Sequence, residues 1–202
     1  TQGNTYYMFS NKNNVNPLTS LLKLYDVEFA VVCPGSRNAP IVHNLNEAGI
    51  ECFPVTDERS AGFYALGMSL KIGLKPVAVC VTSGTALLNL MPAVAEAYYQ
   101  HVPLIIISAD RPADKIDQLD GQTLHQPNAL EPYALKSVNI PEAYTEEQFA
   151  YNNRLINEAI NAIYTGEYGP VHINVPLTEP LYEFSVESLY QERGIGLSKS
   201  YI

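Results

Sequence analysis

The chain has 202 residues, of which 47% are hydrophobic and 16% are charged, and this composition favours one domain with a large buried core. The formal net charge of −9 and the sequence pI near 4.8 argue against nucleic acid and anionic membranes as partners. Small anionic substrates remain possible, because a few arginines beside a site can outweigh the negative charge of the whole protein. No apolar run approaches the ~18 residues that would span a membrane.

Strand and helix patterns alternate along the chain from residue 16. The strand segments are apolar almost throughout and rich in β-branched residues, which is typical of strands buried on both faces. We therefore expect an α/β fold in three layers, a doubly wound, mainly parallel sheet with helices on both faces. The predicted strands are 27–33, 51–55, 77–81, 104–108, 135–139 and 171–175, and the predicted helices are 16–25, 39–48, 57–73, 85–100 and 145–164.

The pattern divides the chain into three parts. Residues 1–15 are interpreted as an N-terminal arm or a cloning scar, residues 16–180 as the domain, and residues 181–202 as a linker toward downstream domains. Within the domain, residues 111–134 are polar, contain several prolines and are predicted to form a long irregular loop. Loops of this length in compact domains are usually functional.

The three cysteines, Cys33, Cys52 and Cys80, lie in or beside predicted buried strands. Their odd number and the absence of a CxxC pair favour reduced core thiols over disulfides or a metal site. Reduced thiols in turn favour a cytoplasmic protein, and we expect no metal ligand in this chain.

Four loops follow predicted strands. Because the carboxyl ends of parallel strands meet at one edge, we expect these loops to share the rim where open α/β sheets bind ligands. They bring carboxylates, arginines and small hydroxyl side chains to that rim. The loops are Pro34-Gly35-Ser36-Arg37, Thr56-Asp57-Glu58-Arg59, Thr82-Ser83-Gly84-Thr85 and Ala109-Asp110-Arg111-Pro112.

The carboxylate pair Asp57-Glu58 allows two interpretations. A Glu58 carboxylate packed against Ala, Gly and Phe side chains would be partly desolvated, and its pKa can then rise until it exchanges protons near neutrality. Alternatively, Asp57 caps a helix and Glu58 merely complements the helix dipole, which is the commoner situation for such a stretch taken alone.

The other two turns are also open to more than one interpretation. Arg37 can bind a carboxylate through two parallel hydrogen bonds, or it can be a solvated surface side chain. The turn at 82–85 can bind phosphate, contact a flat aromatic ring or simply cap a helix. It has no Walker lysine, and Ser36 and Ser83 lack the G-x-S-x-G elbow, which argues against a nucleotide P-loop and a serine hydrolase.

In their order along the chain, these motifs resemble a family of thiamine-diphosphate enzymes of menaquinone biosynthesis, the 2-succinyl-5-enolpyruvyl-6-hydroxy-3-cyclohexene-1-carboxylate synthases. The resemblance covers roughly residues 16–180. A glutamate in a strand–helix turn is generic to thiamine-diphosphate enzymes, whereas the combination of motifs is specific to this family. The motifs are Pro34-Gly35-Ser36-Arg37, Asp57-Glu58-Arg59-Ser60-Ala61-Gly62, Thr82-Ser83-Gly84-Thr85-Ala86, Ala109-Asp110-Arg111-Pro112 and Gly121-Gln122-Thr123-Leu124-His125-Gln126.

The resemblance implies a cofactor site. Glu58 falls on the catalytic glutamate that hydrogen-bonds the aminopyrimidine ring of thiamine diphosphate. Pro34, Thr82 and Ser83 would line the pocket for that ring.

The resemblance also implies a substrate site. Ser36 and Arg37 would face the substrates, with Arg37 pairing with a substrate carboxylate. Gln122 would bind the substrate and contribute to catalysis, although Gly121 stands where the family often has asparagine. Arg111 is interpreted as structural, with contact to a substrate or an effector as the less favoured alternative. The amides beside His125 are interpreted as groups that bind a substrate or tie the loop down.

The implied reaction is decarboxylation of 2-oxoglutarate followed by addition of the succinyl unit to isochorismate, with thiamine diphosphate and Mg²⁺ as cofactors. The GDG…N segment that holds the diphosphate and Mg²⁺ in such enzymes does not occur in this sequence. We therefore expect a separate C-terminal domain and a second subunit, in a homodimer or homotetramer, to complete the site, and we expect this chain alone to be inactive.

Two alternatives stay open. Another thiamine-diphosphate 2-oxoacid decarboxylase, such as a relative of acetolactate synthase, would share Glu58 but not Arg37 in this turn. A non-catalytic, doubly wound module that serves only as an oligomer interface would also explain the low content of charged residues.

Overall fold

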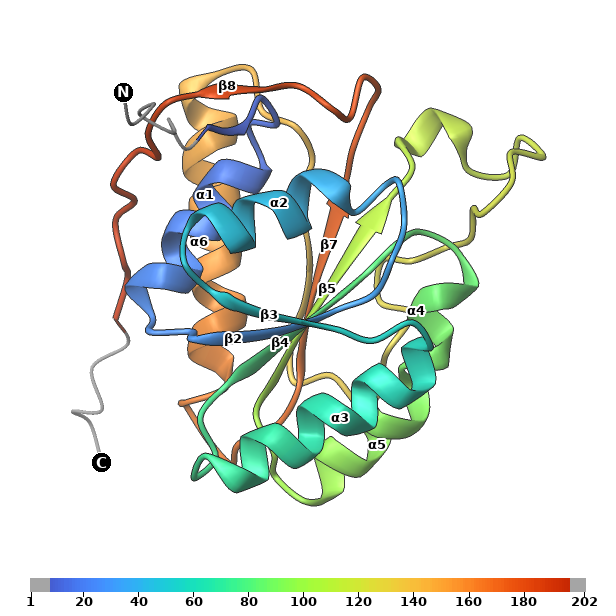
Figure 1. Ribbon diagram of the computed structural model, residues 1–202, viewed down its shortest axis with the longest axis vertical. Helices are drawn as coiled ribbons and strands as arrows, with labels where there is room; N and C mark the ends of the chain where they lie inside the picture. Colours follow the sequence, from blue (N-terminus) through green and yellow to red (C-terminus); the bar gives the residue numbers. More distant parts are fainter. Residues whose placement is uncertain (1–7, 197–202) are drawn as a thin grey trace, which may run out of the picture.

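A six-stranded parallel sheet with the strand order β3-β2-β4-β5-β7-β6 lies at the centre of the fold (Figure 1). The structure is a computed structural model and describes residues 8–196. It confirms the predicted α/β class and the parallel sheet. The strands are β2 (Phe29–Val32), β3 (Glu51–Pro54), β4 (Val77–Val81), β5 (Leu104–Asp110), β6 (Ser137–Asn139) and β7 (Val171–Pro176).

Helices cover both faces of the sheet, as predicted for a doubly wound fold (Figure 1). One group packs on one face and contributes to one hydrophobic core, and a second group packs on the opposite face around a second core. The first group is α1 (Val15–Leu24), α2 (Ala39–Glu47) and α6 (Glu146–Ala162), and the second is α3 (Glu58–Lys71), α4 (Thr85–Asn89) and α5 (Met91–Tyr99).

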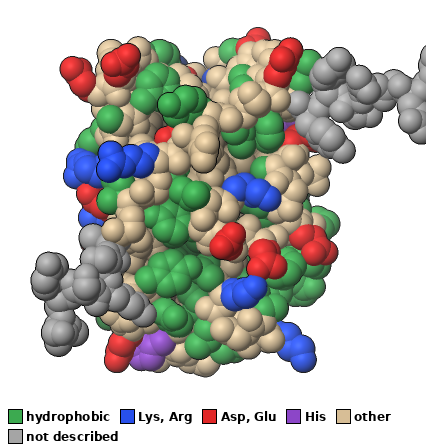
Figure 2. Space-filling model, turned by 90° about the vertical axis from the view of Figure 1, so that its left-hand side faces the viewer, with side chains coloured by type: hydrophobic (Ala, Val, Ile, Leu, Met, Phe, Trp, Pro, Cys, Tyr) green, Lys and Arg blue, Asp and Glu red, His purple; other side chains and the backbone are tan. Residues whose placement is uncertain are grey.

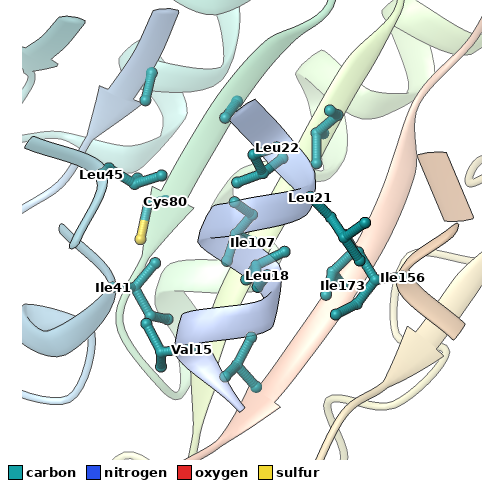
Figure 3. Packing of buried hydrophobic residues seen from close by; sticks show 14 of the residues in the cluster. Val15, Leu18, Leu21, Leu22, Ile41, Leu45, Cys80, Ile107, Ile156 and Ile173 are labelled. Atoms are coloured by element: carbon teal, nitrogen blue, oxygen red, sulfur yellow. The ribbon is translucent and has the colours of Figure 1, made fainter. Parts of the chain in front are cut away.

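Aliphatic side chains from α1 fill the larger core. Leu18, Leu21 and Leu22 are fully buried and belong to the same cluster as Ile107 of β5 and Ile173 of β7 (Figure 3). Each fully buried leucine contributes roughly 1.5–3 kcal/mol relative to an exposed one. This packing fixes the sheet, and with it the positions of the loops at the carboxyl ends of the strands.

Two details of the predicted elements were wrong. The helix predicted over 85–100 is divided into α4 and α5 at Leu90, with Pro92 in the first turn of α5. A proline inside one continuous helix would remove a backbone hydrogen bond and clash with the preceding turn, so the chain starts a new helix instead. In addition, β5 and β7 extend to Asp110 and Pro176, beyond their predicted ends.

A second, two-stranded sheet was not predicted. Strand β1 (Phe9–Ser10) pairs antiparallel with β8 (Phe184–Val186), and both strands are too short to leave a periodic signal in the sequence. Beyond β8 the chain returns along α1 and α6, where the Tyr190 carbonyl accepts a hydrogen bond from Ser20 Oγ (2.9 Å). The described part of the predicted linker thus packs on the domain. The remainder of that linker and residues 1–7 of the predicted N-terminal arm lie outside the described residues.

Figure 2 shows the side of the molecule that carries β8 and the segment that follows it. Hydrophobic side chains gather in the middle and lower part of this face, and charged side chains of both signs are scattered around them. A hollow of about 880 Å³ lies between α1, α6 and residues 186–195. None of the described helices is both long and apolar enough to cross a membrane.

Candidate active site at the carboxyl edge of the sheet

The order of the strands creates a switch point beside β2. The chain runs outward from β2 to β3, then returns to place β4 on the other side of β2, so the loops after β2 and β4 diverge at this point. In open α/β sheets such a switch point forms the ligand-binding crevice. The two loops touch there, because a Cβ added to Gly35 would lie 2.4 Å from Thr82 Cβ. Only glycine permits this close approach.

At the start of α3, the carboxylates of Asp57 and Glu58 have different surroundings. Asp57 is the N-cap, and its carboxylate accepts hydrogen bonds from Ser60 N (2.8 Å) and Ser60 Oγ (2.6 Å). These hydrogen bonds lower the pKa of Asp57. The capping interpretation is therefore confirmed for Asp57. Glu58 follows as the first residue of the helix, half-buried, and its carboxylate makes no hydrogen bond or ion pair within residues 8–196.

The Glu58 carboxylate lies close enough to Cys33 to change the pKa of its thiol. Burial, and then the negative charges of Glu58 and Asp57, raise the pKa of Cys33 to about 12. Cys33 directly follows β2, so the Glu58 carboxylate acts on the end of the strand at the switch point. The same value keeps Cys33 a neutral thiol at physiological pH, in line with the expected reduced core cysteines.

The turn after β4 presents a buried hydroxyl group. Ser83 is 2% exposed, and its Oγ finds no hydrogen-bond partner among the described residues. Gly84 follows with φ +90°, a conformation that L side chains rarely adopt. Its amide N–H donates to Gln126 Oε1 (2.8 Å), so this amide is not available to a phosphate.

The long loop folds over the same turn. It contains no helix or strand apart from one 3₁₀ turn, η1 (Ala113–Lys115). A Cβ added to Gly84 would lie 3.0 Å from Gln122 Cα, so the backbone at Gln122 sits directly on the glycine. Gln122 itself is exposed and has φ +57°. The structure thus brings Gln122 to the turn that carries Ser83.

Arg37 is not the solvated surface side chain that one interpretation predicted. It is 5% exposed, its Nη1 donates to the Leu177 carbonyl (2.8 Å), and its Nη2 pairs with Glu179 Oε1 (3.1 Å). Burial and then the nearby charge of Arg111 lower its pKa, whereas Glu179 and Asp110 act in the opposite direction. Arg37 therefore links the loop after β2 to the segment after β7, while the neighbouring Ser36 stays exposed.

Sequence reasoning missed a buried polar network that underlies this edge. Ser108 Oγ donates to Asn174 Oδ1 (2.7 Å) and contacts His172 Nε2 (2.8 Å), and Asn174 Nδ2 donates to Asp110 Oδ2 (2.8 Å). Burial lowers the pKa of His172 to about 4 and is the main cause of a raised pKa of Asp110. Because Ser108 donates its only hydroxyl hydrogen to Asn174, the neutral His172 donates from Nε2 to Ser108 Oγ. The signal in the sequence was a set of polar residues inside the apolar runs of β5 and β7.

The other three histidines make separate contacts and do not join the Ser108–His172 network. His43 Nε2 contacts the Met8 carbonyl (2.7 Å), His101 Nε2 lies 3.3 Å from Glu167 Oε2, and His125 Nε2 lies 2.7 Å from Asp117 Oδ2 on the surface. These contacts fit structural roles. Of the amides beside His125, the one on Gln126 ties the loop down.

Residues 15–131 match the family model described as "Thiamine pyrophosphate enzyme, N-terminal TPP binding domain". The chain belongs to the thiamine pyrophosphate enzymes. It is also similar to proteins named 2-succinyl-5-enolpyruvyl-6-hydroxy-3-cyclohexene-1-carboxylate synthase. The identity is 56% to the one from Bacteroides thetaiotaomicron and 57% to the one from Phocaeicola vulgatus, each over 93% of this chain and 34% of the relative. For the one from Desulfotalea psychrophila it is 43%, over 88% of this chain and 34% of the relative. The chain spans about a third of the length of these curated relatives.

The edge residues fit a thiamine pyrophosphate enzyme. A pyrimidine ring with an exocyclic amino group needs a carboxylate for its ring nitrogen, hydrogen-bond acceptors for its amino group and room for a flat face. Glu58 offers an unpaired carboxylate, and Ser83 offers a buried hydroxyl group without a partner. Gly84 contributes no side chain to this turn and is itself buried beneath the Gln122 backbone. An unpaired buried polar group is costly unless something else binds it, which favours a ligand at this position.

Proposed function

We propose that this chain is the pyrimidine-binding domain of a synthase that decarboxylates 2-oxoglutarate and adds the succinyl unit to isochorismate in menaquinone biosynthesis. The observation that carries the proposal is 56% identity over 93% of the chain to a relative with that synthase name. The free carboxylate of Glu58 at the switch point supports it, because this chemistry needs an acid beside the cofactor ring.

In this proposal, Glu58 hydrogen-bonds the ring nitrogen of the pyrimidine, and Pro34, Thr82 and Ser83 line the pocket. When bound, thiamine diphosphate supplies the electron sink that decarboxylation of a 2-oxoacid requires. Glu58 holds a proton at the ring nitrogen, and its half-buried position restricts competition from water. A region outside these 202 residues holds the diphosphate and Mg²⁺.

Both substrates are dicarboxylates, and the edge offers two cations to them. Arg111 lies close enough to Arg37 for its charge to lower the pKa of Arg37, on a protein whose formal net charge is −9. Glu179, the side-chain partner of Arg37, is 72% exposed, so a substrate carboxylate can replace it at Nη2. Ser36 and Gln122 are exposed beside Arg37 and the Gly84 turn and complete the substrate site, with Gln122 contacting the reacting groups.

The partners in this proposal are the downstream domains of the same polypeptide and a second subunit, in a homodimer or homotetramer. The outer face of α3 supports such contacts, because it exposes Phe63, Tyr64 and Leu70. Apolar side chains gathered on one helix face are typical of an interface. We place the enzyme in the cytoplasm, which is supported by free thiols at Cys33, Cys52 and Cys80.

The test uses the complete polypeptide that carries this chain, with thiamine diphosphate and Mg²⁺. We expect release of CO₂ from 2-oxoglutarate and consumption of isochorismate in equal amounts. Release of CO₂ from pyruvate or 2-oxoglutarate with isochorismate left untouched would instead assign a general 2-oxoacid decarboxylase. No decarboxylation of any 2-oxoacid would leave the non-catalytic module. In parallel, the 202-residue chain alone should give no product.

A further inference from the structure

The segment 117–126 holds a backbone that a free loop would not adopt. Three of its non-glycine residues, Asp117, Leu119 and Gln122, have positive φ angles, between +57° and +64°. Side chains disfavour this region, and such conformations persist only where the surrounding structure holds them. The exposed contacts inside the loop, such as His125 with Asp117, are not enough to hold it, because surface pairs contribute little.

Gln126 is the buried anchor of this segment. Its side chain is 0% exposed and joins three elements. Gln126 Oε1 accepts from Gly84 N (2.8 Å), and Nε2 donates both to the Ala109 carbonyl (3.0 Å) and to Asn174 Oδ1 (2.9 Å). One amide therefore connects the turn after β4 with the ends of β5 and β7.

The orientation of this amide is fixed by its neighbours. Asn174 Nδ2 donates to Asp110 Oδ2 and to Asn139 Oδ1, both at 2.8 Å, so Asn174 must present its oxygen to Gln126. Since the Asn174 oxygen and the Ala109 carbonyl are acceptors, Gln126 must direct Nε2 toward them and Oε1 toward the Gly84 amide. The network leaves no alternative arrangement with all groups paired.

We propose that Gln126 is the positioning residue for Gln122: it clamps the loop to the Gly84 turn and so holds Gln122 at the substrate site. This inference rests on the proposed function, in which Gln122 contacts the substrates. Gln126 lies four residues after Gln122, and the glycine that it binds is the one on which the Gln122 backbone rests. Its two amide hydrogens and its oxygen are already engaged, so Gln126 acts through Gln122 rather than on the substrate.

The test compares Gln126→Leu with a matched control in the complete enzyme. Asn157→Leu removes another buried amide with at least three hydrogen bonds, in α6 and away from the edge. In Gln126→Leu we expect backbone amides of residues 117–125 to exchange hydrogen about tenfold faster or more, because the local opening becomes easier. We expect kcat/KM for isochorismate to fall by about 10- to 100-fold, the usual cost of a misplaced contact. In Asn157→Leu neither quantity should change.

A double-mutant cycle then separates positioning from general damage. If Gln126 works through Gln122, then Gln122→Ala combined with Gln126→Leu should be as active as Gln122→Ala alone, within about twofold. Losses that multiply would overturn the proposal, as would unchanged exchange at 117–125. If Gln126→Leu does not fold, Gln126→Asn, which keeps the amide but shortens its reach, must show the same pattern. A wild type that leaves isochorismate untouched would defeat the proposed function, while the exchange measurement would still decide whether Gln126 holds the loop.

Discussion

Helices α3 and α6 have similar first turns but differ in the side chains that they expose. Each has a capped first turn with a glutamate at its first position: Asp57 caps α3 before Glu58, and Thr145 caps α6 before Glu146. In α6 the cap is reciprocal, because Thr145 Oγ1 accepts from Gln148 N (3.3 Å) and Gln148 Oε1 accepts from Thr145 N (3.2 Å). Neither glutamate takes part in the cap of its helix.

The two outer faces are also different. On α6, Arg154 pairs with Glu158 at 2.9 Å and lies over the ring of Tyr151, so its charged groups find partners on the helix itself. On α3 the outer face carries Phe63 and Tyr64, while the opposite face is buried in the core. The outer face of α3 thus exposes Phe63, Tyr64 and Leu70, whereas α6 exposes Phe149 and Tyr151 among several charged side chains.

In the proposed function, α6 only supports the fold, whereas α3 also serves the site. The polar side chains of α6 bond both within the helix, as Arg154 does with Glu158, and to neighbouring segments, as Asn157 does with Tyr25. Helix α3 carries an unpaired, half-buried carboxylate at the switch point and an exposed apolar face, two features that suit a ligand and a partner. The proposal thus gives one sequence pattern two roles at the two helix starts, and it assigns them by position on the sheet.

The largest expected difference between the two helices is in turnover. Glu58→Gln in the complete enzyme should lower kcat by about 100-fold or more, because it removes an essential proton-holding group. Glu146→Gln, the matched change at the start of α6, should leave kcat within about twofold, since surface substitutions usually have small effects. Steady-state kinetics with 2-oxoglutarate and isochorismate measure both. Equal effects of the two substitutions would show that Glu58 only complements its helix.

The exposed faces of α3 and α6 should contribute differently to self-association of the complete protein. Phe63 and Phe149 are 41% and 42% exposed, so Phe63→Glu and Phe149→Glu place the same charge on α3 and α6 at similar exposure. In the complete protein, Phe63→Glu should weaken self-association by at least about 1 kcal/mol, as for an interface residue, and Phe149→Glu should not. Sedimentation at several concentrations measures this. An unchanged dissociation constant for Phe63→Glu would remove α3 from the interface.

The smallest expected difference is in how the stability contributed by the two N-cap residues depends on pH. Thr145→Ala should cost about 1 kcal/mol at every pH, because the hydroxyl does not titrate. The pKa of Asp57 is lowered in the folded state by the Ser60 hydrogen bonds. Its contribution to stability is therefore complete above its unfolded pKa of about 4 and is lost as the pH falls through the lowered folded value.

Urea unfolding between about pH 2 and 7 separates the caps. The stability gap between wild type and Asp57→Ala should close in acid, and the gap for Thr145→Ala should persist. A gap for Asp57→Ala that is independent of pH would mean that the carboxylate is not the capping group.

The sequence was sufficient for some parts of this account and not for others. Alternating patterns predicted the strands, the parallel sheet and the loop positions, because those depend on local periodicity. They did not predict the strand order, so the switch point between β2 and β4 emerged only from the fold. The partners of Arg37, Leu177 and Glu179, lie about 140 residues further along the chain. No local rule points to such contacts.

In the candidate site, too, some residues were expected from the sequence and the contacts of others became visible only in the fold. The roles of Glu58, Ser83 and Gln122 were expected from the family resemblance that the loop motifs carry. Gln126 was expected either to bind a substrate or to tie the loop down, and Asn174 was given no role, because their hydrogen bonds join elements distant in sequence. An asparagine inside the apolar strand β7 was the available signal, since a buried amide must find partners.

Hydrogen exchange in the complete protein, with and without thiamine diphosphate and Mg²⁺, tests the central claim most directly. If the carboxyl edge holds the pyrimidine ring, the cofactor should slow exchange at residues 56–60, 82–86 and 121–126. The start of α6, residues 145–149, should exchange equally in both states. Protection confined to the hollow between α1, α6 and residues 186–195, with the edge unchanged, would contradict the account.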